Sequence, residues 1–259
     1  MKKYDKDLLV VTVDYLNAHH VLLTLKDPDG KALPEMKPGQ FVQIYVENSP
    51  STFLRRPISI NYVCREREEM ALLIQEKGEG TRHLMNLNPG DLVRIMLPLG
   101  NGFTMPAEGE KLLLVGGGVG VAPLLYFGME LKKQGIEPTF LLGARTADAL
   151  LELDKFEALG RVFVTTEDGS AGEKGFVTGH SVFDKEHFDR MSVCGPLPMM
   201  KAVARLAREK DMDCEVSLEN MMACGLGACL CCVENTVKGN VCVCKEGPVF
   251  NIKDLLWQI

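Results

Sequence analysis

Four of the nine cysteines in this chain of 259 residues lie within nine positions, in the segment CGLGACLCC at residues 224–232. Cys224, Cys229 and Cys232 have the spacing C-x4-C-x2-C, and Cys244 follows after eleven further residues. This spacing is typical of plant-type [2Fe–2S] proteins, in which four thiolates hold two irons. The glycines of the segment leave room for backbone amides to point at the sulfur atoms. We therefore expect a tight loop around a [2Fe–2S] cluster, with these four cysteines as its ligands.

Two alternatives to the cluster remain open at this point. A structural zinc site usually has two C-x2–4-C pairs, whereas CLCC supplies one pair and CVC, at residues 242–244, is too close for a second. The other alternative is a set of thiols that bind nothing. Cys231 and Cys242 fall outside the cluster spacing, and we assign them no ligand role.

The N-terminus and the net charge exclude several classes of protein. The segment MKKYDKDLLVVTVDYL lacks the apolar core and the cleavage site of a signal peptide. The longest apolar run, KLLLVGGGVGVAPLLYFG, is rich in glycine and shorter than a membrane span. We therefore expect a cytoplasmic protein without a membrane span, where clustered cysteines bind metals or carry out redox chemistry. A formal net charge of −6 without a basic stripe argues against nucleic-acid binding.

Residues 8–100 contain short apolar stretches at regular spacing, such as HVLLTLKD, GQFVQIYV and GDLVRIMLPLG, with turn formers between them. Short strands spaced in this way predict an antiparallel β-barrel or sandwich, and we expect a barrel domain over residues 1–104. One helix interrupts the strands, at the segment TRHLMNL. Thr81 follows Gly80 and is expected to be the N-cap of this helix.

The pattern changes after residue 104 to apolar strands that alternate with helical stretches such as LPMMKAVARLAREKD. Alternation of this kind predicts a parallel sheet covered by helices, and we expect this α/β domain over residues 105–212. A third, cysteine-rich module is expected over residues 213–259. The predicted fold class is thus a β-barrel followed by an α/β nucleotide-binding domain and a small iron–sulfur module.

The segment LLLVGGGVGVAP joins an apolar strand to a helix, which is the setting of a phosphate-binding turn. From Gly118 it reads G-x-G-x-x-P, so a proline replaces the third glycine of the usual dinucleotide fingerprint. The alternative is a tight turn without a ligand. Cys194, in VCGPLPMM, is expected at the carboxyl edge of the same sheet, where open α/β folds bind ligands. The residues predicted to hold a nicotinamide dinucleotide are Gly116, Gly117, Gly118, Gly120 and Pro123.

The segment FLRRPISI indicates a second dinucleotide site, in the barrel. Arg56 can pair with a phosphate, and the hydroxyl of Ser59 can bind the edge of a heteroaromatic ring. The alternative is a surface strand with two solvated arginines. GEGTRHL supplies a second anion site at Gly80 and Thr81. Two phosphate sites in one small barrel suit a dinucleotide such as FAD.

The order RRPIS, GEGT, GGGVGVAP and CGP resembles that of the ferredoxin–NADP reductase superfamily. With MMACGLGACLCCVE and CKEGPVF, the chain resembles, along its whole length, the electron-transfer subunits of NAD-dependent dihydroorotate dehydrogenase B. This resemblance implies an oxidoreductase subunit with FAD, a [2Fe–2S] cluster and NAD as cofactors. The residues it implies around FAD are Arg56, Pro57, Ile58 and Ser59, the backbone of Leu73, Ile74 and Gln75, and Gly80 and Thr81 at the pyrophosphate.

The resemblance also implies a partner, since the chain contains no convincing constellation for oxidising dihydroorotate. Electrons would pass from an FMN-containing dihydroorotate dehydrogenase catalytic subunit, through the cluster and FAD, to NAD in pyrimidine (UMP) biosynthesis. The expected assembly is a two-plus-two heterotetramer. Ser59 is expected near the reactive nitrogen of the flavin, and Cys194 beside the nicotinamide, as catalytic residues.

Two other functions are compatible with the motifs. The first is a flavin and iron–sulfur reductase subunit of another complex, of the hydrogenase, sulfite reductase or transhydrogenase type. The second is a zinc-stabilised binding module without catalysis. The choice between NAD and NADP is open from the residues, because Arg145 favours a 2′-phosphate whereas Asp148 favours NAD. The resemblance favours NAD.

Overall fold

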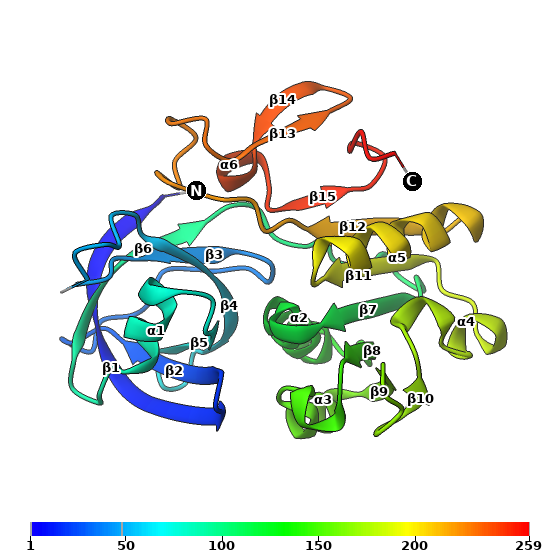
Figure 1. The fold of residues 1–259 in the computed structure, drawn as a ribbon, viewed down its shortest axis with the longest axis horizontal. Helices are drawn as coiled ribbons and strands as arrows, with labels where there is room; N and C mark the ends of the chain where they lie inside the picture. Colours follow the sequence, from blue (N-terminus) through cyan, green and yellow to red (C-terminus); the bar gives the residue numbers. More distant parts are fainter. Residues whose placement is uncertain (1, 48, 259) are drawn as a thin grey trace.

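The computed structural model describes residues 2–47 and 49–258. The first half of the chain forms a closed barrel of six antiparallel strands in the order β1-β2-β5-β4-β3-β6, at the left of Figure 1. Its strands are β1 (Tyr4–Asn17), β2 (His20–Lys26), β3 (Phe41–Ile44), β4 (Arg56–Cys64), β5 (Glu69–Gln75) and β6 (Leu92–Leu99).

The barrel strands are buried on both faces where they meet the second half of the chain. In β2, Val21, Leu23 and Leu25 point into the barrel core. Leu22 points the other way and packs with Phe127 of the next domain. This explains why β2 reads as a nearly continuous apolar run instead of alternating with polar residues.

The helix that follows β5 begins earlier than the sequence predicts. It is α1 (Glu79–Met85), with Gly78 as its N-cap, whereas Thr81 was expected as the N-cap. The Thr81 hydroxyl accepts hydrogen bonds from the amides of Lys77 and Gly78, at 2.8 and 3.2 Å. The expectation was wrong because the threonine lies inside the first turn and bonds back to the residues before it.

The second half of the chain forms a sheet of seven strands in the order β10-β9-β8-β7-β11-β12-β15. All neighbours are parallel except β12 and β15. The chain leaves β7 toward β8 and returns to its other side at β11, so the topological switch point lies between β7 and β11. The strands are β7 (Leu112–Gly117), β8 (Thr139–Ala144), β9 (Arg161–Thr166), β10 (Glu173–Lys174), β11 (Arg190–Cys194), β12 (Asp213–Ser217) and β15 (Val249–Asn251).

Helices cover both faces of this sheet. Alternate residues of β7 separate the layers, because Leu114 packs with α2 and α3, while Leu113 packs with α4 and α5. Within the described part of the chain, every helix is too short or too polar to cross a membrane. The helices are α2 (Ala122–Lys133), α3 (Leu153–Leu159), α4 (Val182–Lys185) and α5 (Leu197–Glu209), with 3-10 turns at η1 (Gly118–Val121), η2 (Ala147–Ala149) and η3 (Val177–Gly179).

The cysteine-rich segment is an excursion between two neighbouring strands of the sheet. It leaves β12 at Ser217 and returns to β15 at Val249, and these two residues are partners in the antiparallel register. The excursion contains β13 (Val233–Thr236), β14 (Gly239–Cys242) and α6 (Val243–Glu246), at the top of Figure 1. The boundary predicted at residue 213 therefore coincides with the start of a strand of the sheet.

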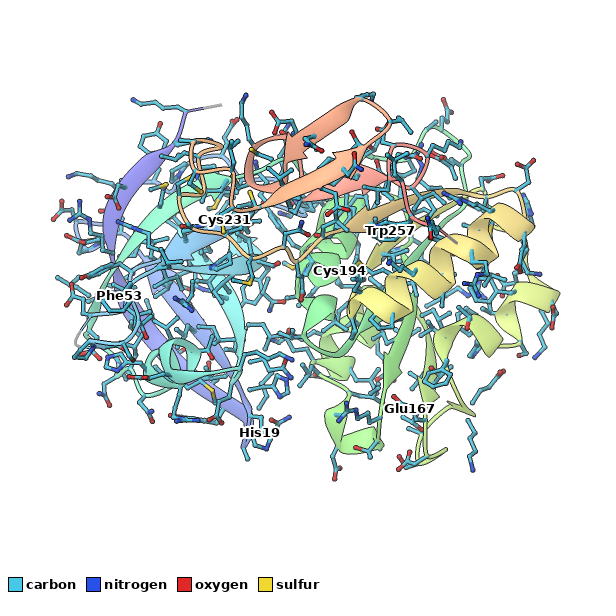
Figure 2. All side chains as sticks on the ribbon, turned by 45° about the horizontal axis from the view of Figure 1, so that its top comes forward. His19, Phe53, Glu167, Cys194, Cys231 and Trp257 are labelled. Carbon is cyan, nitrogen blue, oxygen red and sulfur yellow. The ribbon has the colours of Figure 1, made fainter. Side chains whose placement is uncertain are left out.

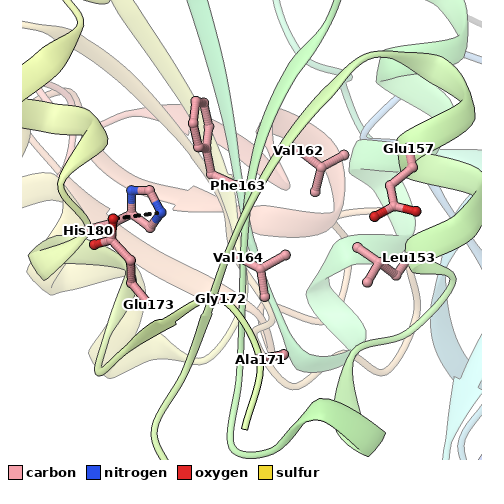
Figure 3. A pocket seen from close by; sticks show the side chains of 9 residues that line it. All are labelled: Leu153, Glu157, Val162, Phe163, Val164, Ala171, Gly172, Glu173 and His180. Atoms are coloured by element: carbon pink, nitrogen blue, oxygen red, sulfur yellow. Dashed lines mark ion pairs between the residues drawn. The ribbon is translucent and has the colours of Figure 1, made fainter. Parts of the chain in front are cut away.

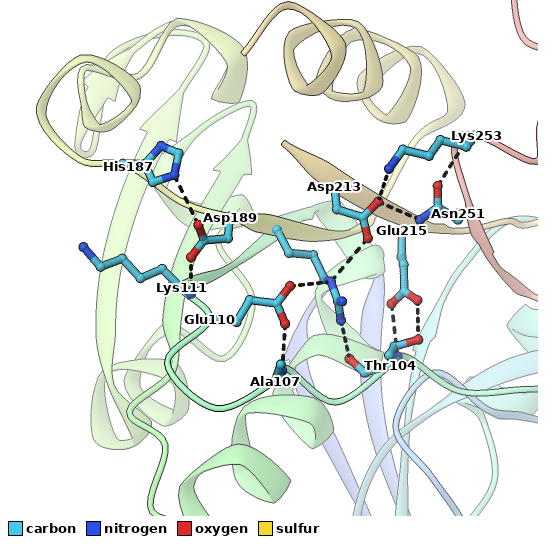
Figure 4. A network of polar contacts seen from close by, with 11 residues as sticks. Thr104, Ala107, Glu110, Lys111, His187, Asp189, Asp213, Glu215, Asn251 and Lys253 are labelled. Carbon is cyan, nitrogen blue, oxygen red and sulfur yellow. Dashed lines mark hydrogen bonds and ion pairs between the residues drawn. The ribbon is translucent and has the colours of Figure 1, made fainter. Parts of the chain in front are cut away.

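A polar network fixes the segment that connects the barrel to the sheet (Figure 4). The amide of Thr104 donates to the Glu215 carboxylate at 3.0 Å, and Arg190 Nε lies 3.1 Å from Glu110 Oε1. The amide of Lys111 donates to Asp189 at 2.8 Å. These contacts hold the connecting segment against β11 and β12, near the amino ends of β7 and β11.

Candidate functional site

A cleft with a volume of about 530 Å³ lies between the barrel and the sheet, and we call it the central cleft. It is lined by segments from all three predicted modules. The barrel contributes residues 54–59 and 77–81 together with Leu73 and Gln75; the glycine loop contributes Val119 and Ala122; and the strand before the cysteines contributes residues 217–222.

The central cleft exists because two barrel strands separate at this point. β4 and β5 are paired from Ile60 and Leu72 onward, toward the other end of the two strands. Residues 56–59 remain paired with β3, and residues 73–75 remain paired with β2. Their opposite edges therefore face the cleft unpaired, and the backbone groups there are available to a ligand.

Most of the residues predicted around FAD meet in the central cleft: Arg56, Pro57, Ile58, Ser59, Leu73, Gln75, Gly80 and Thr81. Ile74 does not line it, because its side chain lies fully buried in the barrel core. The prediction for Ile74 concerned its backbone, which lies on the open edge of β5.

The two adjacent arginines of FLRRPISI have different surroundings. Arg55 forms an ion pair with Asp5 at 3.1 Å, whereas in the described part of the chain Arg56 has no carboxylate partner. Nε and Nη2 of Arg56 donate instead to the carbonyl of Leu54, at 3.1 and 2.7 Å. A Cβ on Gly80 would lie 2.9 Å from Thr52 and 3.2 Å from Arg56 Cδ. The cleft thus combines an unpaired cation with a backbone that only glycine fits, which suits a phosphate group.

The two loops at the switch point of the sheet touch each other. A Cβ on Gly120 would lie 2.5 Å from Gly195 Cα, and a Cβ on Gly117 would lie 2.4 Å from Met199 Sδ. Gly118 has a φ of +55°, in the left-handed region that favours glycine. Gly116 is the second-last residue of β7, and Pro123 is the second residue of α2.

Cys194 is the last residue of β11 and is paired with Gly116 and Ser217 in the sheet. Figure 2 labels it between the barrel and the sheet. Its side chain is 1% exposed, and burial raises the pKa of the thiol. Cys194 is therefore a neutral thiol that does not line the central cleft but lies in the buried cluster that contains Ala122, which does.

The cysteine loop, residues 224–232, directs backbone amides at thiol sulfurs. The amides of Leu226 and Ala228 donate to Cys224 Sγ at 3.3 and 3.4 Å, and the amide of Gly227 donates to Cys244 Sγ at 3.1 Å. Burial acts to raise the pKa of Cys224. The hydrogen bonds to its sulfur from Leu226, Ala228 and Cys229 outweigh this effect and lower the pKa to about 6. The loop thus stabilises a thiolate, the form that binds iron.

The predicted ligands differ in exposure. Cys232 and Cys244 are buried, and the amide of Cys244 donates to Cys232 Sγ at 3.4 Å. Cys224 is half-buried and Cys229 is exposed. Three of the thiols lie on the loop and Cys244 lies in α6, and amides are directed at three of the four sulfurs. Among the described residues no three potential ligands are grouped around one point, as a single metal ion would need. Four cysteines with this spacing and these amides fit a [2Fe–2S] cluster, which distributes its ligands over two irons.

The two cysteines outside the spacing have different environments. Cys231, labelled in Figure 2, is exposed. Cys242 is buried and its thiol points at the carbonyl of Gly227, at 3.7 Å.

The structure adds a cleft residue that no motif indicated. Glu219 lines the central cleft with an exposed side chain, and partial desolvation by the surrounding protein raises the pKa of its carboxyl group, which nearby Lys77 opposes. It follows β12 directly, and its segment SLEN carries no recognisable pattern.

A second cavity, of about 400 Å³, lies at the far edge of the sheet (Figure 3). His180 and Glu173 line it, and His180 Nε2 lies 3.6 Å from Glu173 Oε1. None of the residues predicted from the sequence lines this cavity.

Sequence similarity to curated proteins shows the family of this chain. The electron transfer subunit of dihydroorotate dehydrogenase B (NAD(+)) from Caldanaerobacter subterraneus subsp. tengcongensis is 43% identical over 226 residues, which cover 85% of this chain and 87% of that protein. The subunit of the same name from Lysinibacillus sphaericus is 40% identical over 227 residues, covering 85% and 88%. The chain belongs to the family of dihydroorotate dehydrogenase B electron transfer subunits.

Two domain families match within this electron transfer subunit. Residues 219–256 match the iron-sulfur cluster binding domain of dihydroorotate dehydrogenase B, and residues 114–205 match the oxidoreductase NAD-binding domain. The first match favours an iron–sulfur cluster over zinc. Both matches confirm the predicted kinds of cofactor domain.

Solved structures agree with the predicted fold. The structure described as NADH-dependent reduced ferredoxin-NADP oxidoreductase superposes with a TM-score of 0.86 and 31% identity, over 96% of this chain and 90% of that one. The FAD/NAD binding domain of nitric oxide dioxygenase from Vibrio cholerae superposes with a TM-score of 0.70 at 22% identity, over 82% and 99%, and shows the fold alone. The predicted family and fold class are thus confirmed, whereas the domain boundaries and the roles of individual residues stay predictions.

Proposed function

We propose that this chain carries electrons from a separate dihydroorotate dehydrogenase subunit, through a [2Fe–2S] cluster and FAD, to NAD+. The observation that carries the proposal is the composition of the central cleft. One cavity is lined by the barrel, by the glycine loop and by the segment that leads into the cysteine loop. A group bound there would be adjacent to both other cofactor sites.

The central cleft is the proposed FAD site. Bound FAD supplies exchange of two electrons with a nicotinamide and of single electrons with an iron–sulfur cluster. Arg56 would neutralise the pyrophosphate beside Gly80 and Thr81. The hydroxyl of Ser59 would bind the edge of the ring, and the open backbone edges of β4 and β5 would bind its polar atoms.

The contact between the glycine loop and the loop after Cys194 is the proposed NAD site. The free amides at the start of α2 and the positive end of its dipole would bind the pyrophosphate. Gly120 and Gly195 allow the two loops to approach. Buried Cys194 would lie behind the nicotinamide as a small, neutral side chain.

The cysteine loop is the proposed cluster site, with Cys224, Cys229, Cys232 and Cys244 as ligands. The amides of Leu226, Gly227 and Ala228 would stabilise the thiolates.

The relatives are named as electron transfer subunits, which implies a catalytic partner. We propose that this partner contains FMN, that two copies of each chain form a heterotetramer, and that the complex works in the cytoplasm in pyrimidine biosynthesis. Dihydroorotate would lose two electrons and two protons in the partner, and NAD+ would take up a hydride in this chain.

The test separates the two half-reactions. The purified chain should contain iron, acid-labile sulfide and FAD and should reduce an artificial dye with NADH, without forming orotate. Addition of the FMN subunit should produce orotate and NADH in equal amounts. Orotate formation by the isolated chain, or zinc in place of iron, would contradict the proposal.

A second candidate is supported by the similarity to NADH-dependent reduced ferredoxin-NADP oxidoreductase. In that case the chain would serve a different partner with the same cofactors. Isolation of the native complex discriminates between the two, since only a dihydroorotate dehydrogenase partner would contain FMN and bind orotate.

A further inference from the structure

Gln43 has a buried side chain whose polar atoms have no partner. It lies in β3, and its exposed fraction is 0%. In the part of the chain that the structure describes, neither Nε2 nor Oε1 forms a hydrogen bond. A buried carboxamide without partners has lost its hydrogen bonds to water and forms none within the protein. It is therefore destabilising unless a further group forms hydrogen bonds with it.

The strand places this side chain under the cysteine loop. Val42 and Ile44 point into the barrel core, so Gln43 points outward, on the same face as Phe41. Phe41 packs in the core that contains Cys232 and Cys244. The Gln43 carboxamide therefore lies on the side of the barrel that faces the proposed cluster ligands.

Gln43 lies beside Gly225 of the cysteine loop, the residue after Cys224. A Cβ on Gly225 would lie 3.0 Å from Gln43 Cδ and 3.1 Å from Gln43 Nε2. The φ of +67° at Gly225 turns the chain over the carboxamide at this point. Of the polar atoms of the carboxamide, Nε2 is among the three heavy atoms nearest to this position in the loop.

On its other side Gln43 adjoins the central cleft. Its backbone pairs with Pro57 in β4, and Pro57 lines the cleft. Gln43 is therefore between the proposed FAD site and the proposed cluster site.

We propose that Gln43 donates a hydrogen bond from Nε2 to a sulfur of the cluster or of its ligand Cys224, and that this bond raises the reduction potential of the cluster. The proposal rests on the proposed function, which places the cluster in this loop. Cluster sulfurs accept hydrogen bonds and do not donate them, so they complement the unpartnered amide. Reduction adds negative charge, which makes a donor bond stronger and favours the reduced state. Gln43 would therefore affect electron transfer by changing the reduction potential of the cluster.

The test compares Gln43→Met with Gln40→Met in the full chain loaded with its cofactors. Methionine is close to glutamine in length and cannot donate. Gln40 is the matched control, because it is equally buried and precedes the same strand, but its carboxamide already donates to the carbonyl of Gly100 at 2.8 Å. The measurement is the midpoint potential of the cluster, followed by electron paramagnetic resonance, together with that of the flavin.

We expect Gln43→Met to retain iron and sulfide and to lower the cluster potential, with the flavin potential unchanged. A tenfold change in the one-electron equilibrium between cluster and flavin corresponds to about 59 mV. Gln40→Met should leave the cluster potential unchanged. A Gln43→Met protein with full iron and the wild-type potential would overturn the proposal.

A second measurement decides the question even if Gln43→Met loses iron. In wild-type protein with 15N in its glutamine side chains, pulsed electron paramagnetic resonance of the reduced cluster should show a 15N coupling, because Nε2 would donate a hydrogen bond to a sulfur of the cluster or of Cys224. Absence of that coupling overturns the proposal. If the wild-type chain contains no iron and sulfide, the proposed function itself fails, which distinguishes the two failures.

Discussion

Gly120 and Gly195 meet backbone to backbone where the glycine loop contacts the loop after β11. A Cβ on Gly120 would lie 2.5 Å from the Cα and 2.6 Å from the N of Gly195. The two loops come from different strands on either side of the switch point, and their contact determines how wide the ligand site between them is.

Gly120→Ala should weaken NAD binding selectively. The added methyl forces the two backbones apart at a cost of about 1–3 kcal/mol, and we expect the KM for NADH to rise about tenfold. FAD and iron contents should not change. The measurement is dye reduction at varied NADH, with Gly179→Ala as control, because a Cβ there meets nothing within 4 Å. An unchanged KM would show that the contact is not part of the NAD site.

Arg56→Gln should reduce FAD affinity by about 10- to 100-fold, since a charge-assisted hydrogen bond is worth about 1.5–3 kcal/mol. Arg55→Gln is the matched control and should change FAD affinity much less, because Arg55 already pairs with Asp5. Titration of the apoprotein with FAD, followed by flavin fluorescence, measures both. Equal losses in the two variants would contradict the assignment of Arg56 to the pyrophosphate.

Ser59→Ala should retain FAD and slow NADH-dependent reduction. Loss of one hydrogen bond at the reacting edge of the ring should reduce the rate by about 10-fold or more. Stopped-flow absorbance of the flavin after mixing with NADH measures this step. A variant with normal FAD content and the wild-type rate would remove Ser59 from the reaction.

Cys244→Ser and Cys231→Ser should differ in their iron content. Cys244 is buried and accepts the amide of Gly227 at 3.1 Å, so its replacement should abolish the cluster. Cys231 is exposed and lies outside the spacing, so its replacement should leave iron and sulfide unchanged. Loss of the cluster in Cys231→Ser, with retention in Cys244→Ser, would reverse the ligand assignment.

The stability of the chain should fall below pH 6.5 in part because of His180. Burial lowers the pKa of His180 below its ordinary 6.5, while Glu173 partly opposes this. Its Nδ1 accepts the amide of Val182 at 2.9 Å, which requires an unprotonated nitrogen. Between the folded pKa and 6.5 the unfolded chain binds the extra proton, so the free energy of unfolding decreases as the pH falls.

Urea unfolding between pH 5 and 8 measures this dependence. His180→Asn retains an acceptor for Val182 and should flatten the slope below pH 6.5. His187→Asn is the control, because His187 is exposed. An identical slope in His180→Asn and the wild type would contradict the prediction.

The features that could be predicted from the sequence are those with a local signal. Short apolar stretches separated by turn formers identify the barrel strands, and the turn from β7 into α2 is visible in its glycines. The spacing of Cys224, Cys229 and Cys232 is likewise contained in nine residues.

The features that could not be predicted depend on contacts distant in sequence. The pairing of Ser217 with Val249 joins β15 to the sheet across 31 intervening residues, and no local pattern indicates it. Glu219 and Gln43 belong to no motif. Gln43 can be proposed as a hydrogen-bond donor to the cluster only because the structure packs the cysteine loop against β3.

The register pair Ser217 and Val249 means that the cysteine excursion returns to the place where it started. Antiparallel neighbours can be joined by a turn of two residues. Residues 218–248 could therefore be exchanged for such a turn with every strand of the sheet keeping its neighbours. The segment that contains the cluster ligands can thus be inserted or removed as one unit, and the order of the strands in the nucleotide-binding domain stays the same.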